Sequence, residues 1–412
     1  MVQPKVQVLV IGAGYAGLLA TVRIAMKTRH QNVQITLINP SENFVERPRL
    51  HQFAANQPLK EISISQVLQG TGVQFLQAMV TAIDPKRREV IVQTGVTSQR
   101  LSYDYLLYTA GSAVERESIT GVGQYAYTLN PGGPRSAEAL KSILPQLNRQ
   151  AGHLVVAGGG PTGIEAAAEF AESYPGLRVS LITQGELGGL WGGNIQSHIH
   201  QTLTHLGVSV RDRTTVHEIR QNELLTSEGE SIGFDLCLWA GGFVASPLAR
   251  EAGLAVNERG QLLTDPYMRS VSDPRIYAAG DSAQPVRTSG VRVRMAAYTA
   301  AITGAHAADC LYNAMTNRPQ KPLDFAYLGQ GIALGRHDAV GFNNFPDDTP
   351  KWPTFTGELG VLGREFFVNL LANLPVFERR LPGLHFWPGR GKSKPAAALS
   401  KRKEERKTSL FE

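Results

Sequence analysis

Runs of apolar residues near the start of the chain have the length of buried strands. The run at residues 6–11 leads directly into Gly12-Ala13-Gly14-Tyr15-Ala16-Gly17, which is followed by a helical pattern over residues 18–28. A second apolar run, residues 33–38, ends at Asn39. This order predicts a strand–turn–helix–strand unit at the beginning of the protein.

The same order of patterns recurs in the middle of the chain. Residues 154–157 predict a strand, and Gly158-Gly159-Gly160-Pro161-Thr162-Gly163 makes the turn. Residues 164–173 then predict a helix, and residues 178–182 predict the next strand. This repeat is the main organisational feature of the sequence, because it predicts two dinucleotide-binding units in succession.

The remaining patterns are mostly those of strands until close to the end. Residues 73–107 predict strands with a hairpin turn at residues 84–88, and residues 209–238 have the same character. Residues 323–353 predict loops and strands, and residues 357–377 predict a helix. The segment after residue 389 has the composition of a disordered tail.

Composition and charge narrow the class of protein. The chain has 412 residues, of which 42% are hydrophobic and 18% charged, so two or three globular domains are expected. Residues 390–412 contain eight Lys or Arg and three Asp or Glu, which accounts for five of the six net positive charges. The body is therefore almost neutral, and we expect no nucleic-acid partner.

Two further features concern compartment and redox chemistry. The two cysteines, Cys237 and Cys310, are too few for a disulfide scaffold or a thiolate zinc site, and no metal site is predicted. We find no apolar run of 18 or more residues and no signal-peptide pattern at the N-terminus. These patterns predict a cytoplasmic protein.

The glycines of the two turns have a physical use in nucleotide binding. In such a turn the first glycine permits the tight bend, the second lets the backbone approach a pyrophosphate, and the third allows close helix–strand packing. The helix N-terminus then offers free N–H groups to the phosphates. One such turn is also compatible with an ordinary strand–helix connection, but two in complete units favour nucleotide binding.

The acid that usually ends the second strand and binds the ribose is absent from both units. Asn39 takes its place in the first unit and can still hydrogen-bond a ribose hydroxyl. Thr183 takes it in the second, which removes a negative charge that would repel a 2′-phosphate, but no arginine follows directly. The choice between NADH and NADPH therefore stays open.

Three more segments join small residues to predicted strands: residues 103–112 with Thr-Ala-Gly, 234–243 with Ala-Gly-Gly, and 276–283 with Ala-Gly-Asp. With the two glycine-rich turns and in this order, the sequence over roughly residues 5–310 resembles the two-dinucleotide-domain flavoproteins of the pyridine nucleotide–disulfide oxidoreductase superfamily. The resemblance implies an α/β fold with two Rossmann-like domains, one for FAD and one for NAD(P)H, plus a C-terminal α+β region with an amphipathic helix.

The resemblance also implies domain boundaries and binding residues. Residues 1–112 and 243–320 would form the FAD domain, 113–242 the NAD(P)H domain, 321–389 the C-terminal region and 390–412 the basic tail. Asp281 would bind the ribitol or pyrophosphate, although by itself it could be a turn former. The residues implied for FAD are Gly12, Gly14, Tyr15, Ala16, Gly17, Asn39, Arg47, Val80, Ala110, Gly111, Gly280, Asp281 and Ala296. Those implied for NADH or NADPH are Gly158, Gly160, Pro161, Thr162, Gly163, Thr183 and Gly241.

The dithiol members of the superfamily carry a cysteine pair in the region that corresponds to residues 39–52, which has no cysteine here. The sequence is then most similar to the type II NADH:quinone oxidoreductase-like branch. That likeness implies that Glu165 lies near the nicotinamide and flavin rings and relays protons, whereas the alternative is that it only caps its helix. His51, in the loop implied to lie along the flavin, is a second candidate proton donor, but an exposed loop histidine is the favoured interpretation.

One segment departs from that branch. Its glutamine-rich quinone motif corresponds here to residues 297–303, in which the alanines match and all three glutamines are replaced. The flavin-facing helix is still expected, but the quinone assignment is weakened. Tyr298 could stack on a flat acceptor or belong to the core.

The predicted helix at 357–377 has an apolar stripe of Leu362, Phe366, Leu370 and Leu374, with Arg364 assigned to another face. Such a helix, followed by a basic tail, is typical of docking on an anionic bilayer, which would place the protein on the inner face of the cell membrane. The alternative is packing on the body or on a second subunit of a homodimer.

The patterns leave three functions to compare. The first is an FAD-dependent NAD(P)H dehydrogenase that passes two electrons to a quinone-like small acceptor. The second, suggested by the altered quinone motif, is a flavin-dependent oxidase or tailoring reductase acting on oxygen or a specialised metabolite. The third is a non-enzymatic NAD(H)-sensing flavoprotein.

Overall fold

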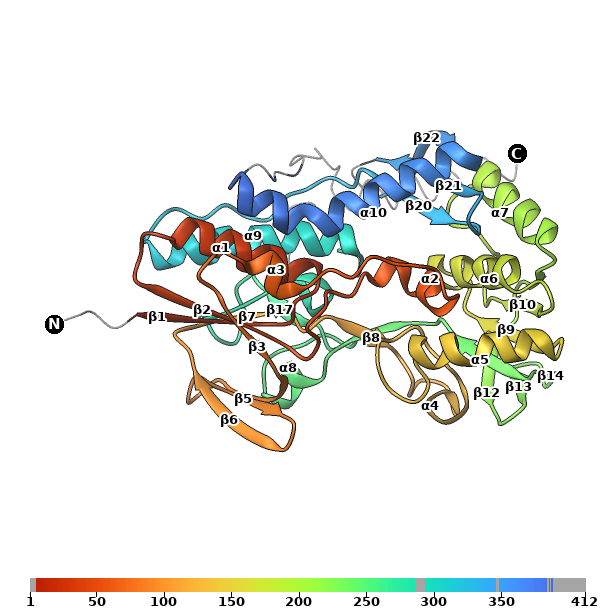
Figure 1. Cartoon of the computed structure of the whole chain (residues 1–412), viewed down its shortest axis with the longest axis horizontal. Helices are drawn as coiled ribbons and strands as arrows, with labels where there is room; N and C mark the ends of the chain where they lie inside the picture. Colours follow the sequence, from red (N-terminus) through yellow and green to blue (C-terminus); the bar gives the residue numbers. More distant parts are fainter. Residues whose placement is uncertain (1–4, 286–292, 346–347, 384, 386, 388–412) are drawn as a thin grey trace, which may run out of the picture.

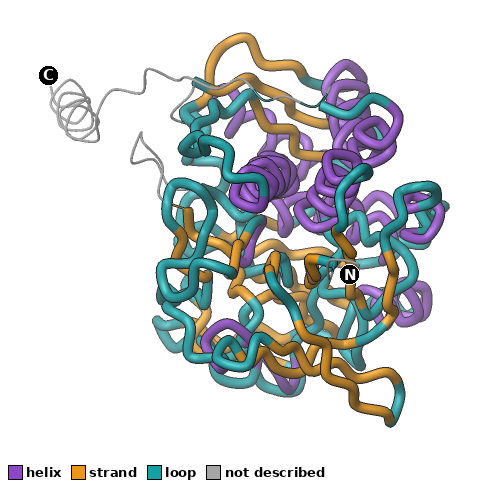
Figure 2. The backbone as a smooth tube through the Cα atoms, turned by 90° about the vertical axis from the view of Figure 1, so that its left-hand side faces the viewer, coloured by secondary structure: helices purple, strands orange, loops and turns teal. Residues whose placement is uncertain are grey.

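The computed structural model describes residues 5–285, 293–345, 348–383, 385 and 387. Two parallel sheets lie side by side along the long axis of the molecule, the N-terminal one at the left of Figure 1 and the second at the right. Helices form a layer over the N-terminal sheet, which is seen end-on in Figure 2. The last described helix, drawn in blue, runs over both halves (Figure 1).

The first sheet has the strand order β18-β7-β1-β2-β3, and every pair in it is parallel. Its strands are β18 (Ile276–Ala278), β7 (Tyr105–Tyr108), β1 (Val6–Ile11), β2 (Val33–Asn39) and β3 (Gln74–Gln77). Helix α1 (Tyr15–Thr28) packs against helix α9 (Ala297–Met315), with Gly304 of α9 against Ala16, and the two helices cover the same face of this sheet (Figure 1). The chain thus returns to the first sheet after completing the second.

The second sheet has the order β11-β10-β9-β15, and it is also parallel. Its strands are β11 (Ser209–Arg211), β10 (Arg178–Ile182), β9 (His153–Ala157) and β15 (Leu236–Trp239). The helices of this half are α4 (Val122–Tyr125), α5 (Ala137–Arg149), α6 (Pro161–Ser173) and α7 (Gly193–His205). The α/β prediction is confirmed, since both repeated units fold as strand–turn–helix–strand.

Both helices that follow the glycine-rich turns begin earlier than the apolar pattern predicts. Helix α1 starts at Tyr15 rather than residue 18, and α6 starts at Pro161 rather than residue 164. Proline is well suited to the first helical position, where its missing N–H would have no partner within the helix. The last residues of each glycine turn are therefore the first turn of a helix.

Smaller antiparallel sheets flank the two parallel ones. The predicted hairpin turn at residues 84–88 joins two strands of one of these smaller sheets. They are β4 (Met79–Asp84), β5 (Glu89–Thr94) and β6 (Thr97–Ser102) beside the first sheet, and β12 (Val216–Ile219), β13 (Glu223–Thr226) and β14 (Ser231–Gly233) beside the second. Strands β8 (Ser112–Val114) and β16 (Phe243–Ala245), which follow the two small-residue turns, pair with each other between the halves. Short elements complete this region: η1 (Arg47–Arg49), α2 (Leu50–Ala54), α3 (Ile64–Leu68), α8 (Leu248–Glu251), β17 (Leu262–Thr264), η2 (Gly280–Ser282) and β19 (Ala283–Pro285).

The C-terminal region consists of the antiparallel sheet β20 (Gly329–Ala333), β21 (Ala339–Asn344) and β22 (Pro350–Phe355), followed by helix α10 (Gly357–Arg380). The predicted strands and helix are confirmed, and the helix extends three residues beyond the predicted end. The predicted disorder after residue 389 lies outside the described residues.

The packing of α10 divides the predicted apolar stripe. Leu362 and Phe366 are 67% and 68% exposed, whereas Leu374 is only 8% exposed. Arg364, expected on another face, is on the buried side, with only 5% of it exposed. Gly360 and Val368 share the buried face with Arg364, and a Cβ at Gly360 would lie 2.1 Å from the Ala339 carbonyl oxygen. The close approach at Gly360 therefore fixes which face meets the body.

By length and composition alone, α10 is long and apolar enough to cross a membrane. It contains no uninterrupted apolar run of that length, because polar residues interrupt this helix. About 39% of its most apolar window is buried against the rest of the protein. We describe it as a surface helix of the body, because its buried face carries Arg364 and Glu378 in polar contacts.

Candidate functional site

The first glycine-rich turn lies at the carboxyl end of β1, and close packing explains two of its glycines. Gly12 has a φ of +93°, and a Cβ there would lie 2.3 Å from the Thr109 carbonyl oxygen. A Cβ at Gly17 would lie 1.8 Å from the Gly12 carbonyl oxygen. Gly14, by contrast, has no atom within 4 Å of its Cβ position, so the backbone there faces open space at the start of α1.

Asn39, at the end of β2, closes this turn from the side. Its Oδ1 accepts a hydrogen bond of 2.9 Å from the Ala13 N–H, and its Nδ2 donates to the Ser41 carbonyl oxygen. The Ala78 N–H donates to the Asn39 carbonyl oxygen. Ala78 lies between strands β3 and β4, and β4 carries the buried Val80. The strand-end asparagine therefore has a structural contact within the turn, while its contact with a ribose stays a prediction.

A polar cluster lies at the same edge, where β7 and β18 end. The Ser112 hydroxyl donates to Asp281 Oδ2 at 2.7 Å, and Arg47 Nη1 donates to the Ser112 carbonyl oxygen at 2.6 Å. Burial raises the pKa of the Asp281 carboxyl, while the Ser112 hydrogen bond, the Arg47 charge and the Ala296 N–H oppose that rise. Ala110, Gly111 and Gly280 are the small residues of the two turns that bring these groups together.

These positions form one continuous edge of the first sheet, and their chemistry fits the FAD that the sequence implies. Gly14 leaves an open approach to the α1 N-terminus, where pyrophosphate oxygens would find N–H donors. Tyr15 begins α1, and its buried hydroxyl, which is influenced by the charges of Glu46 and Arg49, has no hydrogen-bond partner among the described residues. A buried polar atom without a partner is costly, and a bound group with acceptors would satisfy it.

The second glycine-rich turn reproduces this geometry at the end of β9. Gly158 has a φ of +133°, and a Cβ there would lie 2.8 Å from the carbonyl carbon of Ala240, which precedes Gly241. A Cβ at Gly163 would lie 1.8 Å from the Gly158 carbonyl oxygen, whereas that of Gly160 meets nothing within 4 Å. Thr183, at the end of β10, is buried, and a Cβ at Gly159 would lie 2.2 Å from its Oγ1. Pro161 and Thr162 form the first turn of α6.

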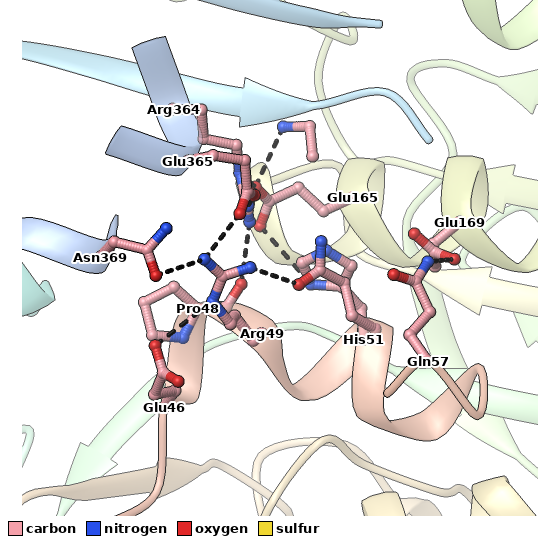
Figure 3. A network of polar contacts seen from close by, with 12 residues as sticks. Glu46, Pro48, Arg49, His51, Gln57, Glu165, Glu169, Arg364, Glu365 and Asn369 are labelled. Atoms are coloured by element: carbon pink, nitrogen blue, oxygen red, sulfur yellow. Dashed lines mark hydrogen bonds and ion pairs between the residues drawn. The ribbon is translucent and has the colours of Figure 1, made fainter. Parts of the chain in front are cut away.

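Between the two turns lies a buried polar network, shown in Figure 3. Glu165 of α6 accepts hydrogen bonds at its Oε1 from Arg364 Nε, at 3.1 Å, and from the Ala333 N–H, at 3.0 Å. Arg364 Nη2 also donates to the Pro48 carbonyl oxygen at 2.9 Å. One guanidinium on α10 thus joins the second unit to the loop after β2 of the first.

Arg49 extends this network on the side of the first unit (Figure 3). Its Nη2 lies 2.6 Å from Glu365 Oε2 of α10, and its Nε lies 3.2 Å from Glu46 Oε2. Glu365 Oε1 in turn accepts from Arg364 Nη1 at 2.7 Å. The two arginines and three carboxylates thereby alternate in sign across the junction.

His51 lies inside this junction, which corrects the expectation of an exposed loop histidine. Only 2% of it is exposed, its Nδ1 lies 3.9 Å from Glu165 Oε2, and its Nε2 has no partner among the described residues. Burial lowers the pKa of the imidazole well below its usual value, and the charges of Arg364 and Arg49 lower it further. His51 is therefore neutral at physiological pH.

Glu165 does not cap its helix, so that alternative is wrong. No side chain caps α6, and the Glu165 carboxylate points instead toward Arg364 and His51 (Figure 3). Burial raises the pKa of this carboxyl, and the Arg364 charge and the Ala333 N–H act against that rise. Arg364 was missed as a site residue, although its spacing of four from Gly360 and Val368 was a signal that it shares their buried face.

The segment predicted to face the flavin, residues 297–303, forms the start of α9. Tyr298 is partly buried there, its hydroxyl donates to the Ala326 carbonyl oxygen at 3.0 Å, and its ring lies 5.7 Å from that of Phe367 in α10.

The two cysteines are 0% and 1% exposed, and burial raises the pKa of each thiol to about 12. Among the described residues no group of three His, Cys, Asp or Glu side chains is placed to hold a metal.

Comparisons with known proteins agree with this architecture. The model of the pyridine nucleotide-disulphide oxidoreductase family matches residues 6–305. The demethylphylloquinone reductase of Synechocystis is 26% identical over 82% of this chain and 87% of its own length. The type II NADH:quinone oxidoreductase of Haemophilus influenzae is 24% identical over 81% of this chain and 86% of its own.

Two solved structures share the fold. A Plasmodium falciparum NDH2 structure in complex with NADH has a TM-score of 0.72 at 18% identity and covers 92% of this chain and 99% of its own. The sulfide:quinone oxidoreductase of Aquifex aeolicus has a TM-score of 0.76 at 16% identity and covers 95% and 98% of the two chains. Both likenesses extend beyond residue 305 into the C-terminal region.

Proposed function

The chain belongs to the pyridine nucleotide-disulphide oxidoreductase family, and on that basis we propose that it is an FAD-dependent enzyme that oxidises NAD(P)H and reduces a quinone-like acceptor. The relatives that match most of its length are named as reductases of quinones, which supports this acceptor class. The domain limits follow from the same proposal: residues 1–112 and 243–320 for FAD, 113–242 for NAD(P)H, and 321–389 for the C-terminal region.

One observation carries the proposal: two glycine-rich turns, each with one glycine open to solvent, lie at the carboxyl ends of two parallel sheets that share a buried junction. Dithiol chemistry is disfavoured for this chain, because both of its thiols are buried and have raised pKa values. Electrons from a flavin would then pass to a small molecule rather than to a protein disulfide.

The FAD site would use the first edge. The open backbone at Gly14 and the N–H groups of Tyr15, Ala16 and Gly17 would bind the pyrophosphate, and Asn39 would contact the adenosine ribose. FAD, when bound, would take a hydride from NAD(P)H and release two electrons to the acceptor. The remaining contributors are Gly12, Arg47, Val80, Ala110, Gly111, Gly280, Asp281 and Ala296.

The NAD(P)H site would use the second edge in the same way. The Cβ position of Gly160 has no atom within 4 Å, so a pyrophosphate can approach the backbone there. The N–H groups of Thr162 and Gly163, in the first turn of α6, would bind it. Thr183 and Gly241 flank that position from the neighbouring strands β10 and β15. The nucleotide would then reach across the junction toward the flavin.

The junction itself is suited to proton transfer. Glu165 Oε1 is held by Arg364 and the Ala333 N–H, which leaves Oε2 facing His51. Because burial raises the pKa of Glu165, this oxygen can hold a proton at a higher pH than an exposed glutamate can. His51 would be the first group of the first unit to meet that proton: its Nδ1 lies 3.9 Å from Glu165 Oε2, and its Nε2 has no partner among the described residues.

We further propose that α10 docks on a bilayer, at the inner face of the cell membrane. Leu359, Leu362 and Phe366 are 67–69% exposed on one side of the helix, and Trp352 of β22 is 79% exposed. Large apolar side chains at this exposure suit insertion into the interfacial region of a membrane, where a quinone acceptor would be available. A second subunit covering this surface is the alternative occupant.

A flotation assay with anionic liposomes tests this placement. Leu362→Asp/Phe366→Asp is expected to lose most liposome binding, whereas Leu190→Asp, at a residue that is 90% exposed in the second unit, should not. Retention of binding by the double variant would argue against docking through α10, and a concentration-dependent dimer abolished by the same variant would favour the second subunit.

Rapid-mixing spectroscopy of the FAD-loaded protein tests the main proposal. NADH or NADPH should bleach the visible absorbance of the flavin, and an added quinone should restore it faster than oxygen does. Absence of bleaching with both nucleotides would refute the proposal. Bleaching followed by equally fast recovery with oxygen alone would support the oxidase, and a long-lived reduced state with every acceptor would support the sensor.

A further inference from the structure

The strand-end position of the second unit is built differently from that of the first, and the difference bears on which nucleotide is accepted. In an NAD site the carboxylate at this position binds the 2′-hydroxyl of the adenosine ribose and repels a 2′-phosphate. Thr183 has no charge, and its side chain lies against Gly159, which leaves no carboxylate at the end of β10 itself.

An arginine from beyond the next strand contacts the loop that follows this position. The loop after β11 is hydrogen-bonded to the loop after β10: the Thr214 N–H donates to the Thr183 carbonyl oxygen at 2.9 Å, and the Arg213 N–H donates to that of Gly185 at 3.1 Å. Arg213 adopts a positive φ of 53° at this point, and its side chain is 75% exposed. Its guanidinium therefore lies over the strand-end loop, although it is distant from that loop in the sequence.

The carboxylates around this arginine leave room for an anion. Arg213 Nη2 contacts Glu186 Oε1, and the Glu186 side chain is 48% exposed, so it can turn into solvent when another anion takes its place. The other nearby carboxylate, Asp212, is engaged elsewhere: its Oδ1 accepts from the Leu187 N–H at 2.9 Å, and its Oδ2 lies 3.8 Å from His200 Nε2. A phosphate carries more charge than a carboxylate and suits the planar fork of an arginine.

We propose that the second unit accepts the 2′-phosphate of NADPH, and that Arg213 is the residue that contacts it in exchange for Glu186. The inference deepens the proposed function and rests on it. It predicts that the nucleotide site takes NADPH at least as well as NADH, with Thr183 as the permissive residue and Arg213 as the attractive one.

Equilibrium binding of two fragments to the FAD-loaded protein tests the proposal without turnover. Adenosine 2′,5′-bisphosphate carries the distinguishing phosphate, and 5′-AMP lacks it. The wild-type protein should bind the bisphosphate at least as tightly as 5′-AMP. Arg213→Ala should weaken bisphosphate binding about tenfold, the loss expected for one charge-assisted contact, and leave 5′-AMP unchanged. Thr183→Glu should act in the same direction.

Arg220→Ala is the matched control, because Arg220 is also an exposed arginine of this unit paired with glutamates, Glu218 and Glu223. It should change neither affinity. The melting temperature and flavin spectrum of each variant would report folding independently. Tighter binding of 5′-AMP than of the bisphosphate by the wild type, or an equal effect of Arg213→Ala on both ligands, would overturn the inference alone. Failure of NADH, NADPH and both fragments to bind would overturn the proposed function with it.

Discussion

The two nucleotide-binding units share one backbone design but are enclosed to different degrees. In the first, α1 has 12 of its 14 residues buried against the sheet and its neighbour α9, and Arg47, Ser112 and Asp281 cover the far end of the edge. In the second, nine of the 13 residues of α6 are buried, and the following helix α7 buries only three of 13. A deeply enclosed site suits a ligand that stays bound, and a more open one suits a ligand that exchanges.

The residues that end the second strand of each unit also differ, and the one in the first unit is held more tightly. Asn39 is hydrogen-bonded on both sides and so is part of the first turn, whereas Thr183 contacts its turn mainly through packing against Gly159. The comparison teaches that the repeat in the sequence specifies the fold of each unit, while the surrounding helices and loops enclose the two units to different degrees, in the sense that the proposed permanent and exchangeable ligands require.

The largest effect is expected from side chains placed at the third glycines. Gly17→Val and Gly163→Val would each drive a Cβ to within 1.8 Å of a carbonyl oxygen in their own turn. We expect Gly17→Val to be purified colourless and Gly163→Val to be yellow but not bleached by NAD(P)H. Absorption spectra and melting curves check this.

Gly363→Ala, at an exposed position with no atom within 4 Å of the Cβ site, is the control and should behave as wild type. If Gly163→Val also lost the flavin, or Gly17→Val kept it, the assignment of the two ligands to the two units would be reversed or wrong.

A smaller but still large effect is expected where the units meet. Arg364→Met removes the partner of the buried Glu165 and should lower the free energy of unfolding by about 3–5 kcal/mol, the usual result of leaving a buried charge unpaired. Denaturant unfolding measures it, and Arg364→Met/Glu165→Gln should recover much of the loss because no unpaired carboxylate remains.

Arg100, paired with Glu89 at 3.2 Å but 58% exposed, offers a contrasting pair whose removal should have little effect. Equal losses for the Arg364 and Arg100 variants would mean that the junction contributes no special coupling between the units.

The pH dependence of stability should report the buried His51. Because its folded-state pKa lies well below its usual value of 6.5, its stabilising contribution is present above pH 6.5 and is lost as pH falls toward the folded-state pKa. His51→Asn should therefore show a shallower loss of stability below pH 6.5 than the wild-type protein, in melts recorded over a pH series.

The contribution of Glu165 to stability changes with pH in the opposite direction. The raised pKa of Glu165 stabilises the folded state below about pH 4.5, the usual value, and that contribution is lost as pH rises through the folded-state pKa. Glu165→Gln should therefore remove a decline in stability that begins as pH rises above about 4.5. An unchanged pH profile in both variants would contradict the pKa directions inferred for the junction.

The smallest effect separates the two strand-end residues. Asn39→Ala removes the acceptor of the Ala13 N–H and should cost about 1–2 kcal/mol of stability, with weaker flavin retention. Thr183→Ala removes only a packed hydroxyl and methyl group and should cost about 1 kcal/mol or less, with the flavin retained. Thermal melts and flavin release on dilution compare them, and a larger loss for Thr183→Ala would invert the contrast.

Local sequence was sufficient for much of this architecture. The apolar runs and the glycine-rich turns predicted both parallel units and the C-terminal helix, because the strand and helix periods and the glycine spacings are local properties. The motif order also led to the family that the comparisons identify. The roles of the predicted ligand-binding residues remain predictions, although the structure brings them to the edges of two sheets.

Side-chain burial and partners were decided only by tertiary packing. His51 was predicted in an exposed loop and Arg364 on another face than the apolar stripe, yet both contact Glu165 inside the molecule. Arg213 is likewise brought from another strand to the loop after Thr183. No local pattern encodes these contacts, because each joins segments that lie far apart in the chain. Periodicity tells which face of a helix is apolar, but only close packing, as at Gly360, decides which face is covered.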